Sequence, residues 1–326
     1  MNGNIQIDNL CKKYAGGIVA LQPTSVAIPT DQAVGIIGEN GSGKSTFIKL
    51  LSGYLKPDSG SVQFKGLSPF RQAAHFRRKL GYLAQDTQLD PEMTGHETLA
   101  LFAAFYAING QKQKQRIQEL GKEYGLEEHL HQTIKRYSGG LRQRLHLALS
   151  LVHDPDFLIL DEPTNALDAA GKKMLWQQIR RRAKQGRTTL IVSHDLFDIE
   201  KHCDHILLFH QGKLLLEGPP RQLVEQDNAY RLVYFVDGKI EQSKLQTQFL
   251  GLPGIRRMDV GRDQILFSID NQFEDMDQQI QRMLQQTGLT ILESRKRKTD
   301  LSTLYFNLTG STGEQKQKGK KKRRNR

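Results

Sequence analysis

The stretch "GENGSGKST", residues 38–46, decides the fold of this chain. It matches G-x-x-x-x-G-K-[ST], in which the backbone N–H groups of a glycine-rich loop wrap a polyphosphate. The apolar run "AVGIIG" at 33–38 predicts a buried strand before the loop, and "KSTFIKLLSG" at 44–53 predicts a helix after it. Strand, loop and helix together predict an α/β domain that binds a polyphosphate.

The phosphate loop, residues 38–46, gives its side chains different tasks. We expect Lys44 to reach the β- and γ-phosphates and the Ser45 hydroxyl to bind Mg²⁺. An ordinary glycine-rich turn is the alternative, which the flanking strand and helix disfavour. The other expected nucleotide contacts are Gly38, Glu39, Asn40, Gly41, Ser42, Gly43 and Thr46.

Two acids end the apolar run "FLILDEP" at 157–163. Sites in parallel sheets form at the carboxyl ends of strands. Asp161 is therefore predicted to reach Mg²⁺, and Glu162, one residue further, to act as the base that polarises water. Taken alone, such a pair could equally be an acidic surface turn.

Polar groups follow two more apolar runs. His194 ends "LIVSHD" and could bond the γ-phosphate or the attacking water. Gln85 in "GYLAQDT" could contact Mg²⁺ or water. By position alone, most such histidines have no special role, and Gln85 would be an ordinary surface residue.

Length and composition place the chain among globular proteins. Its 326 residues suggest about two domains, and 37% hydrophobic with 25% charged residues fit a soluble protein. Only Cys11 and Cys203 occur, so a disulfide framework is not expected. We see no signal peptide, and the longest apolar run, 99–108, is too short to cross a bilayer. Work at a membrane would need another chain.

The net charge of +12 comes mostly from one end of the chain. "KQKGKKKRRNR", residues 316–326, carries eight Lys or Arg and no acid. We expect 311–326 to be a disordered basic tail. Two interpretations stay open for it: a solvated end, or a segment attracted to anionic lipid.

Alternating strand and helix patterns predict an α/β fold with a mainly parallel sheet. Residues 92–153 are mostly helical in pattern and suggest an inserted subdomain. "HILLFHQGKLLLEG" predicts a hairpin with its turn at Gln211-Gly212. "EGPPRQ" at 217–222 marks a boundary, after which 221–310 predicts a small α+β domain.

The segment "RYSGGLRQRLHLAL", residues 136–149, predicts a helix with an unusual start. Ser138 can cap it, but Gly139 and Gly140 weaken its first turn by roughly 1 kcal/mol each. A helix N-terminus without side chains allows an anion to approach its N–H groups closely. We therefore expect an anion at this helix start.

In order, the phosphate loop, Gln85, "YSGGLRQR", "LILDEP", "NALD" and "SHD" resemble the ATP-binding cassette (ABC) ATPase family. The likeness covers about residues 3–220. It implies a P-loop NTPase with a RecA-like core, an antiparallel β-subdomain and a helical subdomain at about 88–153, all within a nucleotide-binding domain at 1–220. ATP and Mg²⁺ are the implied ligands.

The resemblance also implies roles for single residues. Gln85 matches the glutamine between the lobes, Glu162 the general base and His194 the switch histidine. Asp168 matches the aspartate of the D-loop, which is "NALD" at 165–168. Tyr14 in "KKYAG" matches the aromatic that stacks on adenine.

In this family two cassettes pair head to tail, so the signature, Ser138-Gly139-Gly140, would meet the γ-phosphate of the partner's ATP. Tyr137 and Leu141 depart from the common spelling of that motif. One cassette per chain implies a second subunit, expected to be a copy of itself. "LESRKRKTDLSTLYFNLTG" and "YSGGLRQRL" resemble ATPase subunits of small exporter permeases.

Three functions follow as alternatives. The favoured one is an ATP-hydrolysing transport subunit that drives a separate permease, on the cytoplasmic face of the inner membrane. A soluble ABC ATPase acting on nucleic acid or the ribosome is disfavoured, because such chains carry two cassettes or a long coiled coil. A generic P-loop kinase leaves the signature and His194 without a role.

Overall fold

The computed structural model describes residues 4–85, 87–227, 229–238, 240–273, 275–298 and 300–309. Contacts divide the chain into two compact units, Met1–Gly218 and Pro219–Arg326. The first unit contains two sheets and the second unit one, and each unit has its own hydrophobic core. The two units are therefore described separately.

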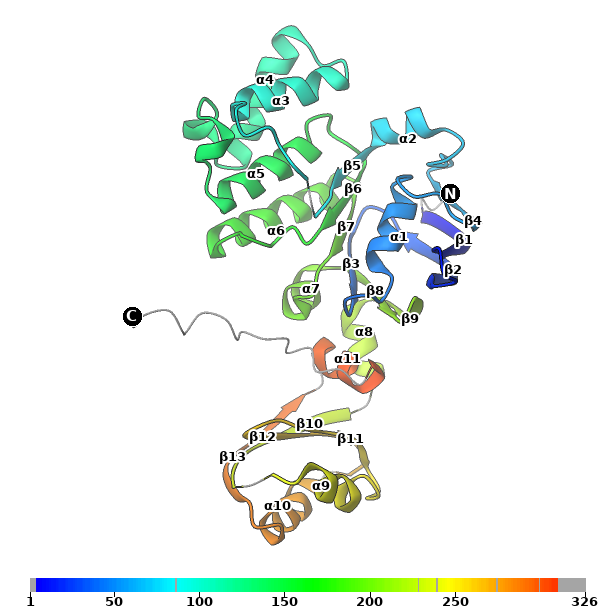
Figure 1. Cartoon of the computed structure of the whole chain (residues 1–326), viewed down its shortest axis with the longest axis vertical. Helices are drawn as coiled ribbons and strands as arrows, with labels where there is room; N and C mark the ends of the chain where they lie inside the picture. The colour runs from blue at the N-terminus through cyan, green and yellow to red at the C-terminus, as the bar shows by residue number, and fades with distance from the viewer. Residues whose placement is uncertain are drawn as a thin grey trace. The chain divides into compact units, whose positions relative to one another are not determined.

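A six-stranded sheet forms the centre of the first unit (Figure 1). Its five parallel strands and the antiparallel edge strand β9 run in the order β5-β6-β7-β3-β8-β9. The predicted hairpin of β8 and β9 is present, with positive φ at both Gln211 and Gly212. The strands are β3 (Ala33–Gly38), β5 (Leu80–Leu83), β6 (Phe157–Asp161), β7 (Thr188–Val192), β8 (His205–His210) and β9 (Lys213–Gly218).

Helices pack on both faces of this sheet, which explains why every residue of its middle strands β6 and β7 is buried. In β3, Val34 and Ile36 belong to the same core as helix α1 (Lys44–Leu51). Gly35, between them, faces the other side, where an added Cβ would lie 2.5 Å from Ile199 of α7 (Leu196–His202). Helix α6 (Ala169–Lys184) also packs against β7 and β3.

A second, antiparallel sheet orders its strands β2-β1-β4. Strands β1 (Asn4–Lys13) and β4 (Ser59–Phe64) correspond to alternating patterns in the sequence. Strand β2 (Val19–Pro29) was not recognised, because Pro23 and several polar residues interrupt its pattern. Helix α2 (Ala73–Lys79) precedes β5.

The helical subdomain consists of α3 (Gly95–Phe105), α4 (Gly110–Glu123) and α5 (Gly139–Ser150), with one-turn helices at Glu127–His129 and Ile134–Arg136. A capping box between Thr94 and Glu97 starts α3. The sequence predicted this helix to run to residue 108. It ends earlier because Ala107 adopts a left-handed backbone conformation, with φ of 59°.

In its described residues, the second unit consists of a four-stranded antiparallel sheet and four helices. Within 221–310, the patterns "YRLVYFVDGKI", "DQILFSID" and "TILESRK" predict three of these strands, and "EDMDQQIQRMLQQTG" predicts α10. Strand β11 and helices α8, α9 and α11 were not predicted, because their short patterns are weakly periodic. The strands are β10 (Ala229–Asp237), β11 (Ile255–Val260), β12 (Gln264–Asp270) and β13 (Thr290–Lys298), in the order β11-β12-β10-β13. The helices are α8 (Pro220–Gln226), α9 (Gln242–Phe249), α10 (Met276–Gln286) and α11 (Leu301–Thr309).

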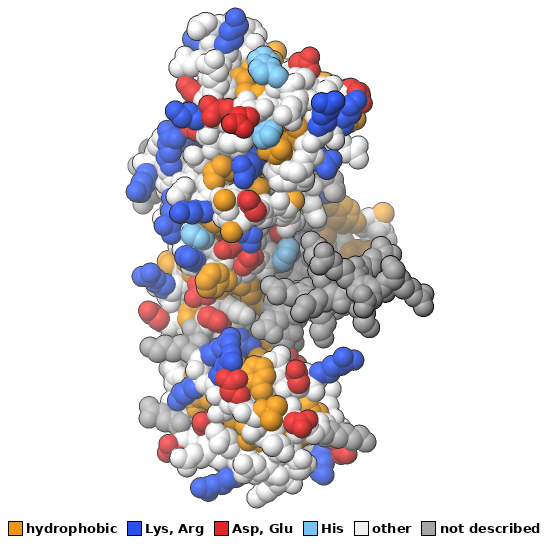
Figure 2. Space-filling view, turned by 90° about the vertical axis from the view of Figure 1, so that its left-hand side faces the viewer, with side chains coloured by type: hydrophobic (Ala, Val, Ile, Leu, Met, Phe, Trp, Pro, Cys, Tyr) orange, Lys and Arg blue, Asp and Glu red, His pale blue; other side chains and the backbone are white. Residues whose placement is uncertain are grey.

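Basic side chains line the edge strand β13, where Arg295, Lys296 and Arg297 are all exposed. Figure 2 shows Lys and Arg side chains spread over this unit among acidic and hydrophobic ones. Charged side chains of this kind protect an unpaired sheet edge from pairing with another chain. The predicted basic tail, 311–326, lies outside the described residues. No helix in the described part of the chain is long and apolar enough to cross a membrane.

Candidate active site

The predicted catalytic residues follow strands that end at one edge of the parallel sheet. Strand β3 leads into the phosphate loop, β6 ends at Asp161, and β7 is followed by His194. The register places Val192 beside both Ile36 and Asp161. Adjacent parallel strands therefore bring these three segments to the same edge.

The glycines of the phosphate loop are required by the backbone. Gly38 and Gly43 have φ of 154° and 100°. A Cβ on Gly38 would lie 2.3 Å from the carbonyl oxygen of Phe209, and one on Gly43 would lie 2.6 Å from that of Ala20. Helix α1 begins at this loop without a side-chain cap. Its first N–H groups are thus available to a phosphate.

Lys44 is buried among the atoms of its own loop. Its Nζ donates to the carbonyl oxygens of Gly38 at 2.8 Å and Glu39 at 2.7 Å. Burial lowers the pKa of the ammonium, and the charges of Glu162 and Asp161 partly offset that effect. The amine lies in the loop that would enclose a polyphosphate.

Glu162 and His194 meet across the sheet edge. The Nδ1 atom of His194 lies 2.9 Å from Oε1 of Glu162. The other oxygen of this carboxylate, Oε2, is buried and has no hydrogen-bond partner in the described part of the chain. Glu162 also has a left-handed backbone, with φ of 51°. Strained backbones of this kind are concentrated at functional sites.

The remaining predicted residues surround this centre. Asp161 is buried at the end of β6, and its charge acts on Lys44. Ser45 is exposed in the first turn of α1, and Gln85 is exposed two residues beyond β5. The Tyr14 hydroxyl lies 3.4 Å from Oγ1 of Thr46 in the same helix turn as Ser45.

The signature forms the N-terminus of α5. Ser138 caps the helix by accepting a hydrogen bond from the Leu141 N–H at 3.2 Å. A Cβ on Gly139 would meet nothing closer than 3.6 Å, whereas one on Gly140 would lie 3.3 Å from the Ala166 carbonyl oxygen. Packing within the chain therefore gives a reason for a glycine at 140 but not for one at 139.

The D-loop lies against the signature helix. Gln143 of α5 donates to the Pro163 carbonyl at 3.0 Å, and Arg144 lies 3.5 Å from the Asp168 carboxylate. Asp168 also caps α6, by accepting from the Gly171 N–H at 2.8 Å. The acidic strand end and the signature are thus joined within one subunit.

Tyr137, which departs from the common spelling of the signature, packs within the helical subdomain. Its buried hydroxyl donates to the His129 carbonyl at 2.7 Å and fits against the bare backbone of Gly95. The tyrosine therefore fixes the signature to its own subdomain. Sequence reasoning noted this residue but not this contact, because His129 and Gly95 are separated from it along the chain.

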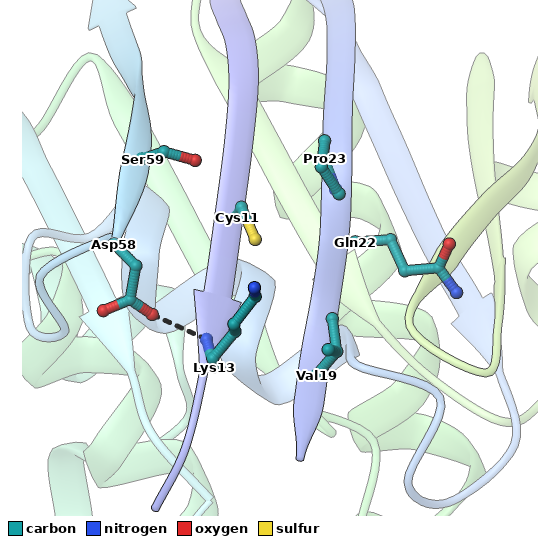
Figure 3. Close-up of a pocket in the computed structure, with 7 residues that line it drawn as sticks. All are labelled: Cys11, Lys13, Val19, Gln22, Pro23, Asp58 and Ser59. Carbon is teal, nitrogen blue, oxygen red and sulfur yellow. Dashed lines mark hydrogen bonds between the residues drawn. The ribbon is translucent and has the colours of Figure 1, made fainter. Parts of the chain in front are cut away.

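A hollow of about 580 Å³ lies on the antiparallel sheet (Figure 3). The Asp58 carboxylate at its rim accepts a hydrogen bond from the Lys13 N–H at 2.6 Å. Its lining shares no residue with the predicted site. The lining residues are Cys11, Lys13, Val19, Gln22, Pro23, Asp58 and Ser59.

The fold and the glycine-dependent phosphate loop define a P-loop NTPase. Residues 21–165 match the family model described as ABC transporter. The chain is 32% identical, over 68% of its length and 73% of the relative, to the Nod factor export ATP-binding protein I of Burkholderia orbicola. This chain belongs to the ABC transporter family of ATP-binding proteins and is an ATPase.

Other comparisons extend this likeness. The daunorubicin resistance ATP-binding protein DrrA3 of Streptomyces coeruleorubidus is 29% identical over 94% of this chain and 96% of its own. A dimeric ATP-binding cassette in a post-hydrolysis state, bound to ADP and Pi, is 26% identical, with a TM-score of 0.61 over 66% of this chain and 98% of that one. The cbiO1 subunit of the Clostridium perfringens cbiONQ transporter complex is 26% identical, with a TM-score of 0.63 over 70% and 92%.

Proposed function

We propose that this chain is the ATP-hydrolysing subunit of an exporter-type ABC transporter, which pairs head to tail with a second copy around two ATP molecules. The observation that carries the proposal is the meeting of Glu162 and His194 beside the phosphate loop. The export function is suggested by relatives whose names refer to Nod factor export and daunorubicin resistance.

Within the site, Glu162 acts as the general base toward the attacking water. Its buried Oε2 atom has a free acceptor position, while its Oε1 atom is held by His194. His194, 70% exposed at its side chain, can turn to bond the γ-phosphate. Lys44 then leaves its loop carbonyls for the β- and γ-phosphates.

Mg²⁺ would enter with the ATP. Ser45, Asp161 and Gln85 offer the hydroxyl, carboxylate and amide oxygens that this ion prefers, with phosphate oxygens completing its shell. The described residues contain no cluster of three or more His, Cys, Asp or Glu side chains that would hold a metal alone. An Mg²⁺ ion that arrives bound to ATP fits these oxygen donors, because the phosphates supply its other ligands. Its chemistry is to neutralise charge on the transferred phosphoryl group.

The signature serves the ATP of the partner subunit. Gly139 is exposed, and packing within the chain does not require a glycine there. A bare helix N-terminus favours an anion through its dipole and free N–H groups. The γ-phosphate on the partner's loop is that anion, and Tyr14 stacks on the adenine bound to its own subunit.

ATP binding then closes the dimer, and hydrolysis opens it. A separately encoded permease uses this motion, as expected for a subunit whose structural relative belongs to the cbiONQ complex. The chain would therefore lie on the cytoplasmic face of the membrane, where its basic tail attracts anionic lipid.

Affinity purification of the tagged chain from detergent-treated membranes tests the transport function. We expect an integral membrane protein to co-purify in a fixed ratio and to stimulate or restrain ATP hydrolysis. Recovery with ribosomes or RNA, and without a membrane protein, would instead support the soluble alternative.

A further inference from the structure

An ion-paired lysine joins two helix starts that border the site. The Nζ atom of Lys172 in α6 lies 3.2 Å from Oδ2 of Asp195 and 3.3 Å from Oδ2 of Asp198. Both aspartates belong to the N-terminal turn of α7. One ammonium group therefore connects the first turn of α6 to the first turn of α7.

Along the chain, each of these two helix turns comes directly after a residue that is proposed to contact the nucleotide. Asp168 caps α6, and its carbonyl accepts from the Lys172 N–H at 2.9 Å, one turn along the helix. Asp195 caps α7 by accepting from the Asp198 N–H at 3.1 Å, and it follows His194 in the chain. The lysine thus links the segment after the D-loop to the segment after the histidine.

The pKa shifts of Lys172 and Asp195 have the directions expected for an ion pair. Burial disfavours the ammonium, but hydrogen bonds to Asp195 and Asp198 raise the pKa of Lys172 overall. Burial likewise disfavours the Asp195 carboxylate, yet the Asp198 N–H and Lys172 lower its pKa. Both shifts favour the charged forms of Lys172 and Asp195 near neutral pH, so their ion pair persists there.

We propose that Lys172 is a positioning residue for ATP hydrolysis, which holds the α7 start so that His194 stays aligned with Glu162. This inference rests on the proposed roles of those two residues. Half-exposed ion pairs contribute only about 0–1 kcal/mol to folding, so the pair is poorly explained by global stability. The side chain of His194 is 70% exposed, so its ring is positioned by the contact with Glu162 and by the connection of its backbone to α7.

Kinetics of the full-length chain test the proposal. We expect Lys172→Met to lower kcat about tenfold, because small displacements of catalytic groups are costly, while KM for ATP stays within about twofold. Lys172→Arg should recover most of the rate. Lys173→Met is the matched control: this neighbouring lysine is exposed, and its substitution should leave the rate unchanged.

Two further readouts separate positioning from general destabilisation. Amide hydrogen exchange across 193–199 should be faster in Lys172→Met than in Lys173→Met, with equal melting temperatures. Asp195→Asn keeps a capping residue but removes the charge. Adding it to Lys172→Met should therefore lower kcat little further.

Several results would overturn the inference. One is a Lys172→Met variant with the kcat and exchange pattern of the control. Another is a loss of rate that matches a loss of melting temperature and is not recovered by arginine. A different result would show that the proposed function itself is wrong: the Glu162→Gln variant would then hydrolyse ATP at the rate of the wild type. In that case faster exchange in Lys172→Met would still support the helix connection, and unchanged exchange would refute it.

Discussion

At the scale of single residues, the site depends on groups that are costly to place. Glu162 combines a left-handed backbone with a carboxylate of which one oxygen is buried, and Lys44 is a buried amine. Neither arrangement stabilises the folded domain when no nucleotide is bound. Both arrangements are what the proposed function requires, because a polyphosphate needs a cation beside it and the attacking water needs a base.

Glu162→Gln should retain ATP binding but slow hydrolysis at least about tenfold, because an amide cannot accept the proton of the attacking water. The variant should accumulate as an ATP-bound dimer. Steady-state phosphate release and size-exclusion chromatography with ATP measure both effects. Turnover near that of the wild type would remove Glu162 from the role of general base.

Lys44→Ala should weaken ATP binding itself, because it removes the cation that neutralises the β- and γ-phosphates. Fluorescent ATP titration of the monomer measures this loss. Lys49→Ala, in the same helix but outside the phosphate loop, is the control. Equal affinity for ATP in the two variants would contradict the proposed contact.

At the scale of elements, the helical subdomain is fastened to the parallel sheet by His153. Its ring stacks on Tyr106 with centroids 3.7 Å apart, and its Nε2 atom lies 2.9 Å from the Leu80 carbonyl oxygen at the start of β5. Arg116 of α4 donates to two carbonyls at the end of α5, those of Leu151 and Val152. These contacts join the end of α5 to the strand that leads to Gln85.

This joint predicts a pH dependence of stability. Burial lowers the pKa of His153 to about 4, below the usual value of about 6.5. Between these values the unfolded chain binds the proton more readily, so His153 reduces stability as pH falls from 6.5 toward 4. In His153→Gln, thermal unfolding should shift less between pH 7.5 and 5 than in the wild type. Identical shifts would contradict the burial effect.

The signature helix yields a complementation test. Ser138→Arg should bind ATP as a monomer but fail to dimerise, because its side chain fills the γ-phosphate position. Mixed with Lys44→Ala, it should recover ATP-dependent dimer by light scattering, since one composite site contains neither defect. No gain on mixing would leave two accounts: both motifs act within one chain, or one intact site cannot hold the dimer.

At the scale of the whole molecule, the sequence predicted what short motifs encode. The loop at 38–46, the acids after β6 and the hairpin turn at Gln211-Gly212 depend on local geometry, and each is legible in a few residues. Strand β2 and the bridge from Lys172 to α7 were not predictable, because they depend on segments brought together only by the fold. The roles expected of Gln85 and Tyr14 instead rest on the family likeness, because position alone would leave Gln85 an ordinary surface residue.

The basic tail, residues 316–326, carries most of the net positive charge of the whole chain. Removal of 316–326 should leave ATP hydrolysis intact, since every proposed catalytic residue lies outside it. It should weaken binding to anionic vesicles, most strongly at low salt. Vesicle flotation measures this, and equal partitioning of both forms would identify the tail as a solvated end.

The central claim is that each ATP is held between the phosphate loop of one subunit and the signature of another. Disulfide crosslinking of two separately labelled chains, one with Ser42→Cys and the other with Ser138→Cys, tests it most directly. The native thiols, Cys11 and Cys203, are buried. Any crosslink formed by chains that carry only these two thiols measures the background. We expect a crosslink between the two labels that requires ATP and is strengthened by Glu162→Gln. Absence of that heterodimeric crosslink, with ATP bound to both chains, would contradict the composite site.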